Sequence, residues 1–167
     1  MVFSGHKIII FSKNGRLTLR ILNSEDYIYL QDKTDPESLP DLVDQFTAYI
    51  EENYPEYHGV NVVYDCSDTN ESIYSELMTG KSNYDLINVS DYMAQKIVSG
   101  GYAVPILNNE NDENPWSEIP NYEAYASETI KTTLDEIIAV QKKYNEDTKK
   151  WEDVEVPLKD YAVGYMW

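Results

Sequence analysis

The sequence predicts an α/β fold with a parallel sheet. Short runs rich in β-branched residues alternate with amphipathic stretches, and capping residues or glycines mark most of the boundaries between them. Strands that alternate with helices in this order form right-handed β-α-β units, in which successive strands lie parallel. A length of 167 residues is enough for one domain with a sizeable core.

The first predicted β-α-β unit begins with residues 17–22 (LTLRIL), which alternate as a half-buried strand does. A helix is predicted over 38–53, with Ser38 as its N-cap and Pro40 in its first turn. Residues 60–64 (VNVVY) follow as the second strand. The helix is predicted from apolar residues at helical spacing, namely Leu42, Val43, Phe46 and Ile50.

The second unit begins with a helix. Asp68 and Glu71 are three residues apart, as in a capping box, so they predict the start of a helix that ends near Gly80. Residues 84–89 (YDLINV) predict the third strand. The side chains of this helix that are predicted to face the core are Ile73, Leu77 and Met78.

Ser90 is predicted to cap a third helix, which runs to about Val98 and ends at the glycine pair 100–101. Residues 102–107 (YAVPIL) are predicted to return toward the sheet. The stretch 108–116 is rich in Asn, Asp and Glu and predicts a loop.

The last third of the chain is predicted to hold one long helix and a final strand. Residues at helical spacing predict the helix over 127–143. A polar turn (YNEDTKKWED) follows, and then Pro157 and a strand over 160–166. The helical stripe consists of Ile130, Leu134, Ile137, Ile138 and Gln141.

The net charge is the outstanding feature of the composition. Thirteen basic and thirty acidic residues give −17, spread along the chain. Such a field repels nucleic acid and anionic membranes, and it favours cationic ligands or basic partners. It also keeps a protein soluble, a role that requires no ligand.

Several other classes of protein are not predicted. The single cysteine excludes an internal disulfide, and two histidines without partners at ligand spacing do not indicate a metal site. No stretch approaches the roughly 20 apolar residues of a spanning helix, and no export signal is recognisable. The sequence has no Gly-rich phosphate loop and no nucleophile elbow, so neither an enzyme nor a cofactor is predicted.

Four motifs in order give the chain a family resemblance. The motifs are NSEDY at 23–27, TNESIY at 69–74, YDLINVSDY at 84–92 and YMW at 165–167. Through them the chain resembles the periplasmic spermidine/putrescine-binding proteins, the receptors of polyamine ABC transporters, over about 17–107 and again at 157–167.

The resemblance implies the first lobe of a type II periplasmic binding protein fold, truncated before the hinge and the second lobe. Residues 1–16 would be an N-terminal extension, and 17–167 the incomplete lobe. Such a receptor closes two lobes on a linear polyamine (spermidine or putrescine), with carboxylates on the ammonium groups and aromatic rings along the methylenes. It would lie outside the cytoplasmic membrane and be peripheral to it through the permease subunits.

The resemblance also implies ligand-binding residues. Tyr27, Ser90 and Tyr92 match first-lobe contacts, and Ser24 and Glu25 stand at two more contact positions. The family has tryptophan where this chain has Ser24, which removes an aromatic platform for a cation. Glu25 adds a carboxylate that is able to hold an ammonium group by charge-assisted hydrogen bonds.

Several neighbouring acids and tyrosines are interpreted as structural residues rather than as ligand contacts. Asp68, Glu71 and Asp91 are interpreted as carboxylates of helix caps or first turns, favoured there by the helix dipole. Asp85 is interpreted as a structural acid bonded to backbone amides. The residues interpreted as core rather than site are Tyr74 and Tyr84.

Two alternatives to a polyamine receptor stay open. The first keeps the fold and changes the ligand, because the same fold serves many solutes and Ser24 replaces the aromatic residue. A different class is an acidic module that binds a basic partner through the −17 surface. That module predicts binding that weakens steeply with salt and tolerates changes at Tyr27 or Tyr92.

Overall fold

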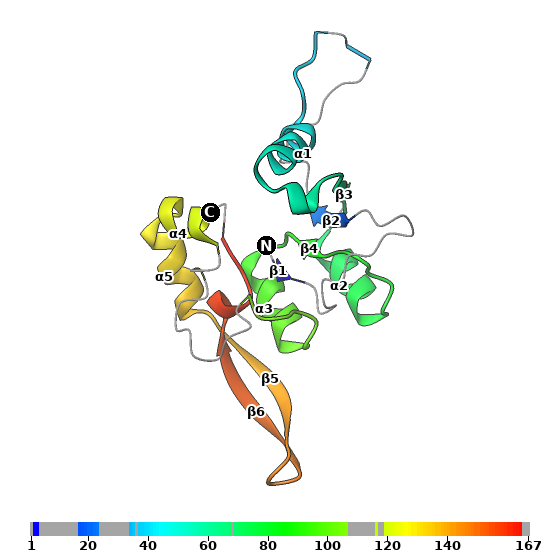
Figure 1. Cartoon of the computed structure of the whole chain (residues 1–167). Coiled ribbons are helices and arrows are strands. Elements are labelled where there is room, and N and C mark those ends of the chain that lie inside the picture. The colour runs from blue at the N-terminus through cyan, green and yellow to red at the C-terminus, as the bar shows by residue number, and fades with distance from the viewer. Residues whose placement is uncertain are drawn as a thin grey trace.

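The computed structural model shows a mixed α/β chain (Figure 1). The structure describes residues 2–3, 17–23, 34–35, 37–67, 69–106, 116 and 119–164.

A four-stranded sheet holds the first half of the chain together. Its order is β1-β4-β2-β3, and the central strand β2 (Thr18–Asn23) pairs in parallel with β3 (Asn61–Cys66) and with β4 (Leu86–Ile87). This confirms the parallel sheet. β4 is shorter than the predicted 84–89, and β1 (Val2–Phe3) pairs antiparallel with it. β1 thus adds a strand to the sheet from within the segment that was interpreted as an extension.

The first helix begins later than predicted. α1 spans Leu42–Asn53 and is followed by the short 3-10 helix η1 (Pro55–Tyr57). Its N-cap is Asp41, whose Oδ1 accepts from Asp44 N at 2.8 Å. The prediction of Ser38 as N-cap was wrong because Ser38 belongs to the preceding turn, where its amide donates to the carbonyl of Asp35 at 3.1 Å.

The second helix, α2 (Asn70–Met78), is capped by Thr69, whose Oγ1 accepts from Ser72 N at 3.1 Å. The predicted capping residue Asp68 lies outside the described residues. Gly80, at φ 67°, follows the helix as predicted. The prediction for Met78 was wrong: it follows the buried Leu77 by one residue, hence about 100° around the helix, and 53% of it is exposed.

The core lies between the sheet, α2, α3 (Asp91–Ser99) and the C-terminal segment. Leu22 and Ile87 are adjacent on β2 and β4 and contribute one face of the sheet. The largest fully buried side chains are Ile73, Ile87, Met93, Ile97, Val98 and Leu158.

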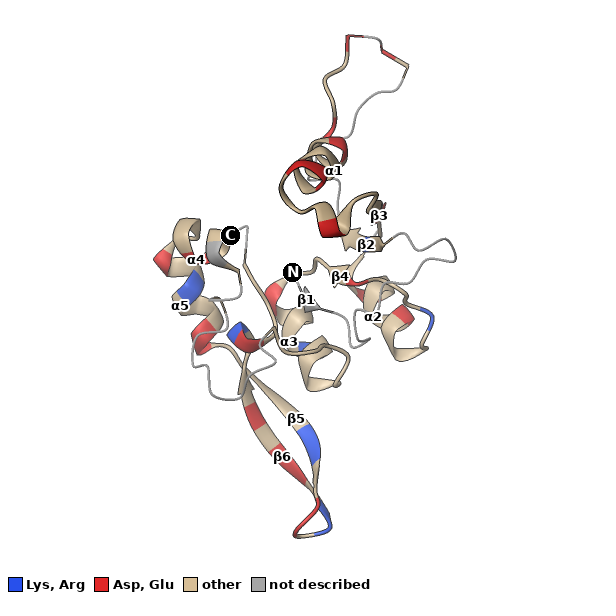
Figure 2. Cartoon of the chain, viewed as in Figure 1, with Lys and Arg blue, Asp and Glu red and all other residues tan. Residues whose placement is uncertain are grey.

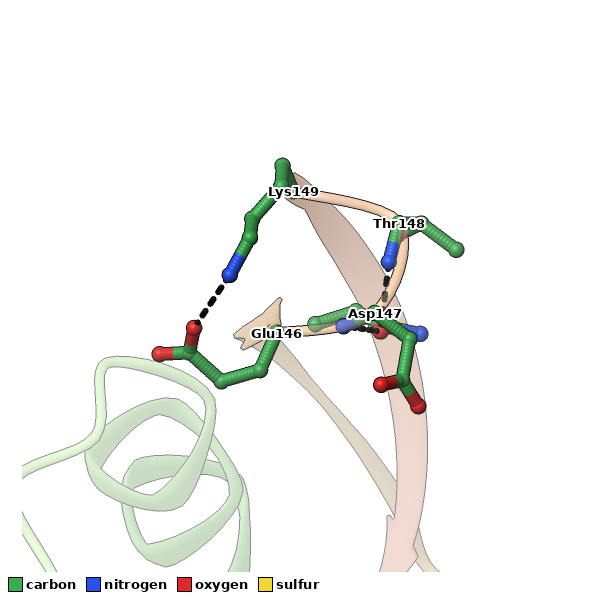
Figure 3. A network of polar contacts seen from close by, with 5 residues as sticks. Glu146, Asp147, Thr148 and Lys149 are labelled. Carbon is green, nitrogen blue, oxygen red and sulfur yellow. Dashed lines mark hydrogen bonds and ion pairs between the residues drawn. The ribbon is translucent and has the colours of Figure 1, made fainter.

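The predicted helix over 127–143 was right only in its first half. α4 (Pro120–Tyr125) and α5 (Glu128–Glu136) are followed by a two-stranded hairpin, β5 (Ile138–Asn145) and β6 (Lys150–Pro157). Ile137 already has an extended backbone, at φ −81° and ψ 115°. The predicted polar turn is the tip of this hairpin, where Asn145 Oδ1 accepts from the amides of residues 147 and 148 and Lys149 pairs with Glu146 at 3.0 Å (Figure 3).

The predicted last strand was also wrong within the described residues. Its first residue belongs to a 3-10 turn, η3 (Leu158–Asp160), because the Tyr161 amide donates to the carbonyl of Leu158 at 3.0 Å. Residues 102–106 reach this turn rather than the sheet, with Ile106 N donating to the Asp160 carbonyl at 2.7 Å.

α1 lies over the β2–β3 side of the sheet, away from α2 and α3 (Figure 1). Among the described residues it buries no side chain fully, and Leu42, Phe46 and Tyr49 are 51%, 38% and 50% exposed. None of the helices in the described part of the chain has the length and apolar character needed to cross a membrane.

Candidate functional site

Two helices begin at the same edge of the sheet. β3 ends at Cys66 and α2 starts at Asn70, while β4 ends at Ile87 and α3 starts at Asp91. Because β3 and β4 both run parallel to β2, their carboxyl ends meet at one edge. Open α/β sheets bind ligands at this edge.

Four side chains at this edge are joined by hydrogen bonds, and we call them the α2–α3 cluster: Asn70, Glu71, Ser90 and Tyr92. Asn70 Nδ2 donates to Ser90 Oγ at 2.9 Å and to Tyr92 Oη at 3.2 Å. Tyr92 Oη donates to Glu71 Oε1 at 3.2 Å. The Ser90 amide completes the arrangement with a long bond to Asn70 Oδ1, at 3.4 Å.

Ser90 stands at the N-cap position of α3 but does not cap it as predicted. Its side chain accepts no hydrogen bond from a backbone amide of the helix. Its Oγ instead accepts one from Asn70 Nδ2. Asp91 supplies a carboxylate in the first turn, as predicted, and accepts from the Tyr92 amide at 2.6 Å. The Ser90 hydroxyl is therefore directed to the α2–α3 cluster, and 53% of Tyr92 is exposed beside it.

Sequence reasoning missed Asn70 and assigned Glu71 to capping. Glu71 does lie in the first turn of α2, but its Oε1 accepts the Tyr92 hydroxyl. The signal that points to both residues is their place at the start of the helix that follows β3, at the same sheet edge as Ser90.

A buried polar layer lies at the ends of the strands. Asn88 Nδ2 donates to Asn23 Oδ1, and Asn23 Nδ2 donates to Tyr64 Oη at 2.8 Å. Only 2% of Asn23 and 7% of Asn88 is exposed. Buried amides need hydrogen-bond partners, so these consecutive hydrogen bonds hold the carboxyl ends of β2 and β4 in a fixed position relative to each other.

The three remaining predicted site residues, Ser24, Glu25 and Tyr27, follow Asn23 directly and lie outside the described residues. Their assignment as ligand contacts stays a prediction.

The residues interpreted as structural lie elsewhere. Asp85 Oδ2 accepts from the Arg20 amide at 2.8 Å, which confirms its bond to the backbone. Tyr84 and Tyr74 pack against the core as predicted. Burial and the hydrogen bond from its hydroxyl to Asp65 raise the pKa of Tyr84.

The α2–α3 cluster presents an aromatic ring, a hydroxyl and a carboxylate, a set that suits a cation with an alkyl portion better than an anion. The chain is 27% identical over 150 residues to the putrescine-binding periplasmic protein SpuD of Pseudomonas aeruginosa (strain UCBPP-PA14). It is a distant relative of that protein.

The similarity covers 89% of this chain and 28% of the relative, so the chain spans little more than a quarter of the relative's length. No family model matches the chain, and no solved structure matches it significantly. The relative's name describes it as a periplasmic protein that binds putrescine. The parallel three-stranded part of the sheet is consistent with a lobe of a periplasmic binding protein.

Proposed function

We propose that this chain supplies one wall of a binding site for a linear polyamine, such as putrescine or spermidine, in the receptor of an ABC transporter. The observation that carries the proposal is the α2–α3 cluster, in which Glu71 and Ser90 flank the exposed Tyr92 at the ligand edge of the sheet. Similarity to a putrescine-binding protein supports the choice of ligand.

The chemistry of a polyamine fits this set of groups. A primary ammonium donates three hydrogen bonds, and Glu71 and Ser90 offer acceptor oxygens beside the Tyr92 hydroxyl: Glu71 Oε1 lies 3.2 Å from it, and Ser90 Oγ shares the Asn70 Nδ2 donor with it. The ring face attracts the cation and covers its methylenes. The charge of −17 raises the local concentration of any cation.

The single wall that this chain supplies should bind a polyamine with only modest affinity. A charge-assisted hydrogen bond contributes about 1.5–3 kcal/mol and an exposed cation–π contact about 0.5–1 kcal/mol, before the cost of association. The expected dissociation constant of this chain alone is therefore on the order of millimolar. The fuller site, including the predicted contacts of Ser24, Glu25 and Tyr27, is part of the same proposal.

A titration followed by NMR tests the proposal. ¹⁵N-labelled chain is titrated with putrescine, with propylamine and with MgCl₂, all at equal ionic strength. We expect saturable shifts that centre on residues 70–71 and 90–92 and are larger for putrescine than for Mg²⁺. Tyr92→Ala should abolish them, whereas Tyr125→Ala, which removes a tyrosine that is 86% exposed on α4, should leave them unchanged.

Two results would contradict the proposal. Equal shifts with Mg²⁺, spread over the acidic surface, would indicate the acidic module for a basic partner. Saturable shifts at the α2–α3 cluster with an uncharged solute, and none with putrescine, would indicate a solute receptor with another ligand.

A further inference from the structure

The β5–β6 hairpin has one face against the protein and one face in solvent. Side chains alternate between the two faces of a strand. Ala139, Gln141 and Val156 share the inner face and are buried at 1%, 7% and 8% exposure. This face packs beside α3, where Gln141 Nε2 donates to the Val98 carbonyl at 2.9 Å.

The hairpin outer face consists of four cross-strand pairs: Ile138 with Pro157, Val140 with Glu155, Lys142 with Asp153, and Tyr144 with Trp151. Four of its apolar members are exposed, with Trp151 at 67%, Val140 at 46%, Tyr144 at 43% and Ile138 at 39%. The rings of Tyr144 and Trp151 meet edge to face at 5.6 Å, and Lys142 Nζ lies 2.8 Å from Asp153 Oδ1. Exposed apolar side chains gathered on one face in this way make the face a candidate interaction surface.

The charge of the hairpin indicates which partner fits it. Residues 138–157 carry four of the thirteen basic residues of the chain against five acidic ones, so their net charge is −1 in a chain of −17. Figure 2 shows basic residues on β5 and at the tip facing acidic residues on β6, whereas α1 is acidic. A basic partner would prefer such acidic surfaces. A second copy of this chain repels those surfaces and meets the least repulsion at the hairpin.

We propose that the hairpin outer face binds the same face of a second copy of this chain. With a two-fold axis parallel to the strands and midway between the two faces, β5 of one copy lies over β6 of the other. Each residue then lies opposite the second copy's equivalent of its own cross-strand partner. Tyr144 then opposes Trp151 of the second copy, and Lys142 opposes its Asp153. Self-complementarity of this type is what a two-fold interface requires.

The small size of the face sets the strength of the dimer. A strand of eight residues is about 26 Å long, and the face is two strands wide. It buries less than the roughly 1,200 Å² of a standard stable interface, so the dimer is weak, with a dissociation constant on the order of 10–100 µM.

Sedimentation velocity on the whole chain from about 5 to 500 µM, a range that brackets this constant, tests the proposal. We expect a monomer–dimer equilibrium in the wild type, and at least about tenfold weaker association after Trp151→Ser. Lys150→Ser, one residue earlier on the inner face, is the matched control and should leave association unchanged. Added NaCl should strengthen the dimer because it screens the repulsion between two chains of −17.

Cross-linking provides a second readout that does not depend on removing Trp151. In a Cys66→Ser background, Val140→Cys should give a dimer with a bismaleimide, and Lys143→Cys on the inner face should not. A wild-type chain that stays monomeric over the whole concentration range would overturn the proposal. So would equal cross-linking from both positions, or a dimer that Trp151→Ser does not weaken.

Discussion

Asn70 joins the start of α2 to the start of α3: its Nδ2 lies 2.9 Å from Ser90 Oγ, although twenty residues separate them. The same nitrogen lies 3.2 Å from Tyr92 Oη. One amide therefore sets the positions of both predicted site residues that the structure describes.

Replacing Asn70 by Ala should release Ser90 and Tyr92. We expect stability to fall by about 0.5–1.5 kcal/mol, the usual net contribution of such a bond, and the putrescine-induced NMR shifts to disappear. Thr69→Ala is the control, since it removes the cap of α2, at about 1 kcal/mol, and Thr69 is not a member of the α2–α3 cluster. Urea unfolding and the NMR titration together separate the two effects. Equal loss of shifts in both variants would mean that helix stability, not the amide, controls binding.

The buried pair of Asn23 and Asn88 is a second place where a substitution should lower stability. Asn88→Ala removes the donor to Asn23 Oδ1 at a site where water does not reach freely, so we expect a loss of about 1–3 kcal/mol in the free energy of unfolding. Asn61→Ala, at the exposed start of β3, should change stability by less than about 0.5 kcal/mol. A double-mutant cycle of Asn88→Ala with Tyr64→Phe measures the coupling through Asn23. Strict additivity would contradict a connected layer.

Two residues of α2 that were both predicted to face the core should behave differently. Ile73→Ala empties a fully buried position and should cost about 2–5 kcal/mol. Met78→Ala, at a position 53% exposed, should cost less than about 1 kcal/mol. Chemical denaturation measures both, and a similar cost for the two would refute the orientation of α2.

The pH dependence of stability should contain a contribution from Asp160. Burial, and then the nearby Asp135, raise the pKa of this carboxyl above its usual 3.8, while Lys159 lowers it. The native state then holds the proton more tightly than the unfolded state, so Asp160 makes stability fall as pH rises through its folded pKa. Asp160→Asn should stabilise the protein at neutral pH, and the gain should vanish below about pH 3.8. Urea denaturation at several pH values measures this, and a gain independent of pH would contradict it.

Local sequence patterns were sufficient to predict the strands and helices whose hydrophobic periodicity is unambiguous. β2, β3, α2 and α3 follow from periodicity and from residues that end helices, such as Gly80. The hairpin was missed because Ile137, Ile138 and Gln141 satisfy a helical period, while Ala139 and Gln141 also satisfy the period of a strand. Pairing with residues 150–157, which a local pattern does not reveal, decides between them.

The site was predicted in part for a related reason. Ser90 and Tyr92 follow a strand directly, so the topology of the sheet places them at its ligand edge. Asn70 and Glu71 sit where capping residues are common, and local rules gave Glu71 a capping role. Its actual partner, the hydroxyl of Tyr92, comes from another helix and is fixed only by tertiary packing.

The attachment of the hairpin to α3 determines how it moves. Gln95, Val98 and Ser99 bond to β5 only at residues 138–141, near its base. The outer half is held by its own ladder and by the ring contact of Tyr144 with Trp151. This half is able to open by local unfolding while the core stays intact, so its amides should exchange with solvent much faster than those of α3. Association with a second copy would slow that exchange at the tip first.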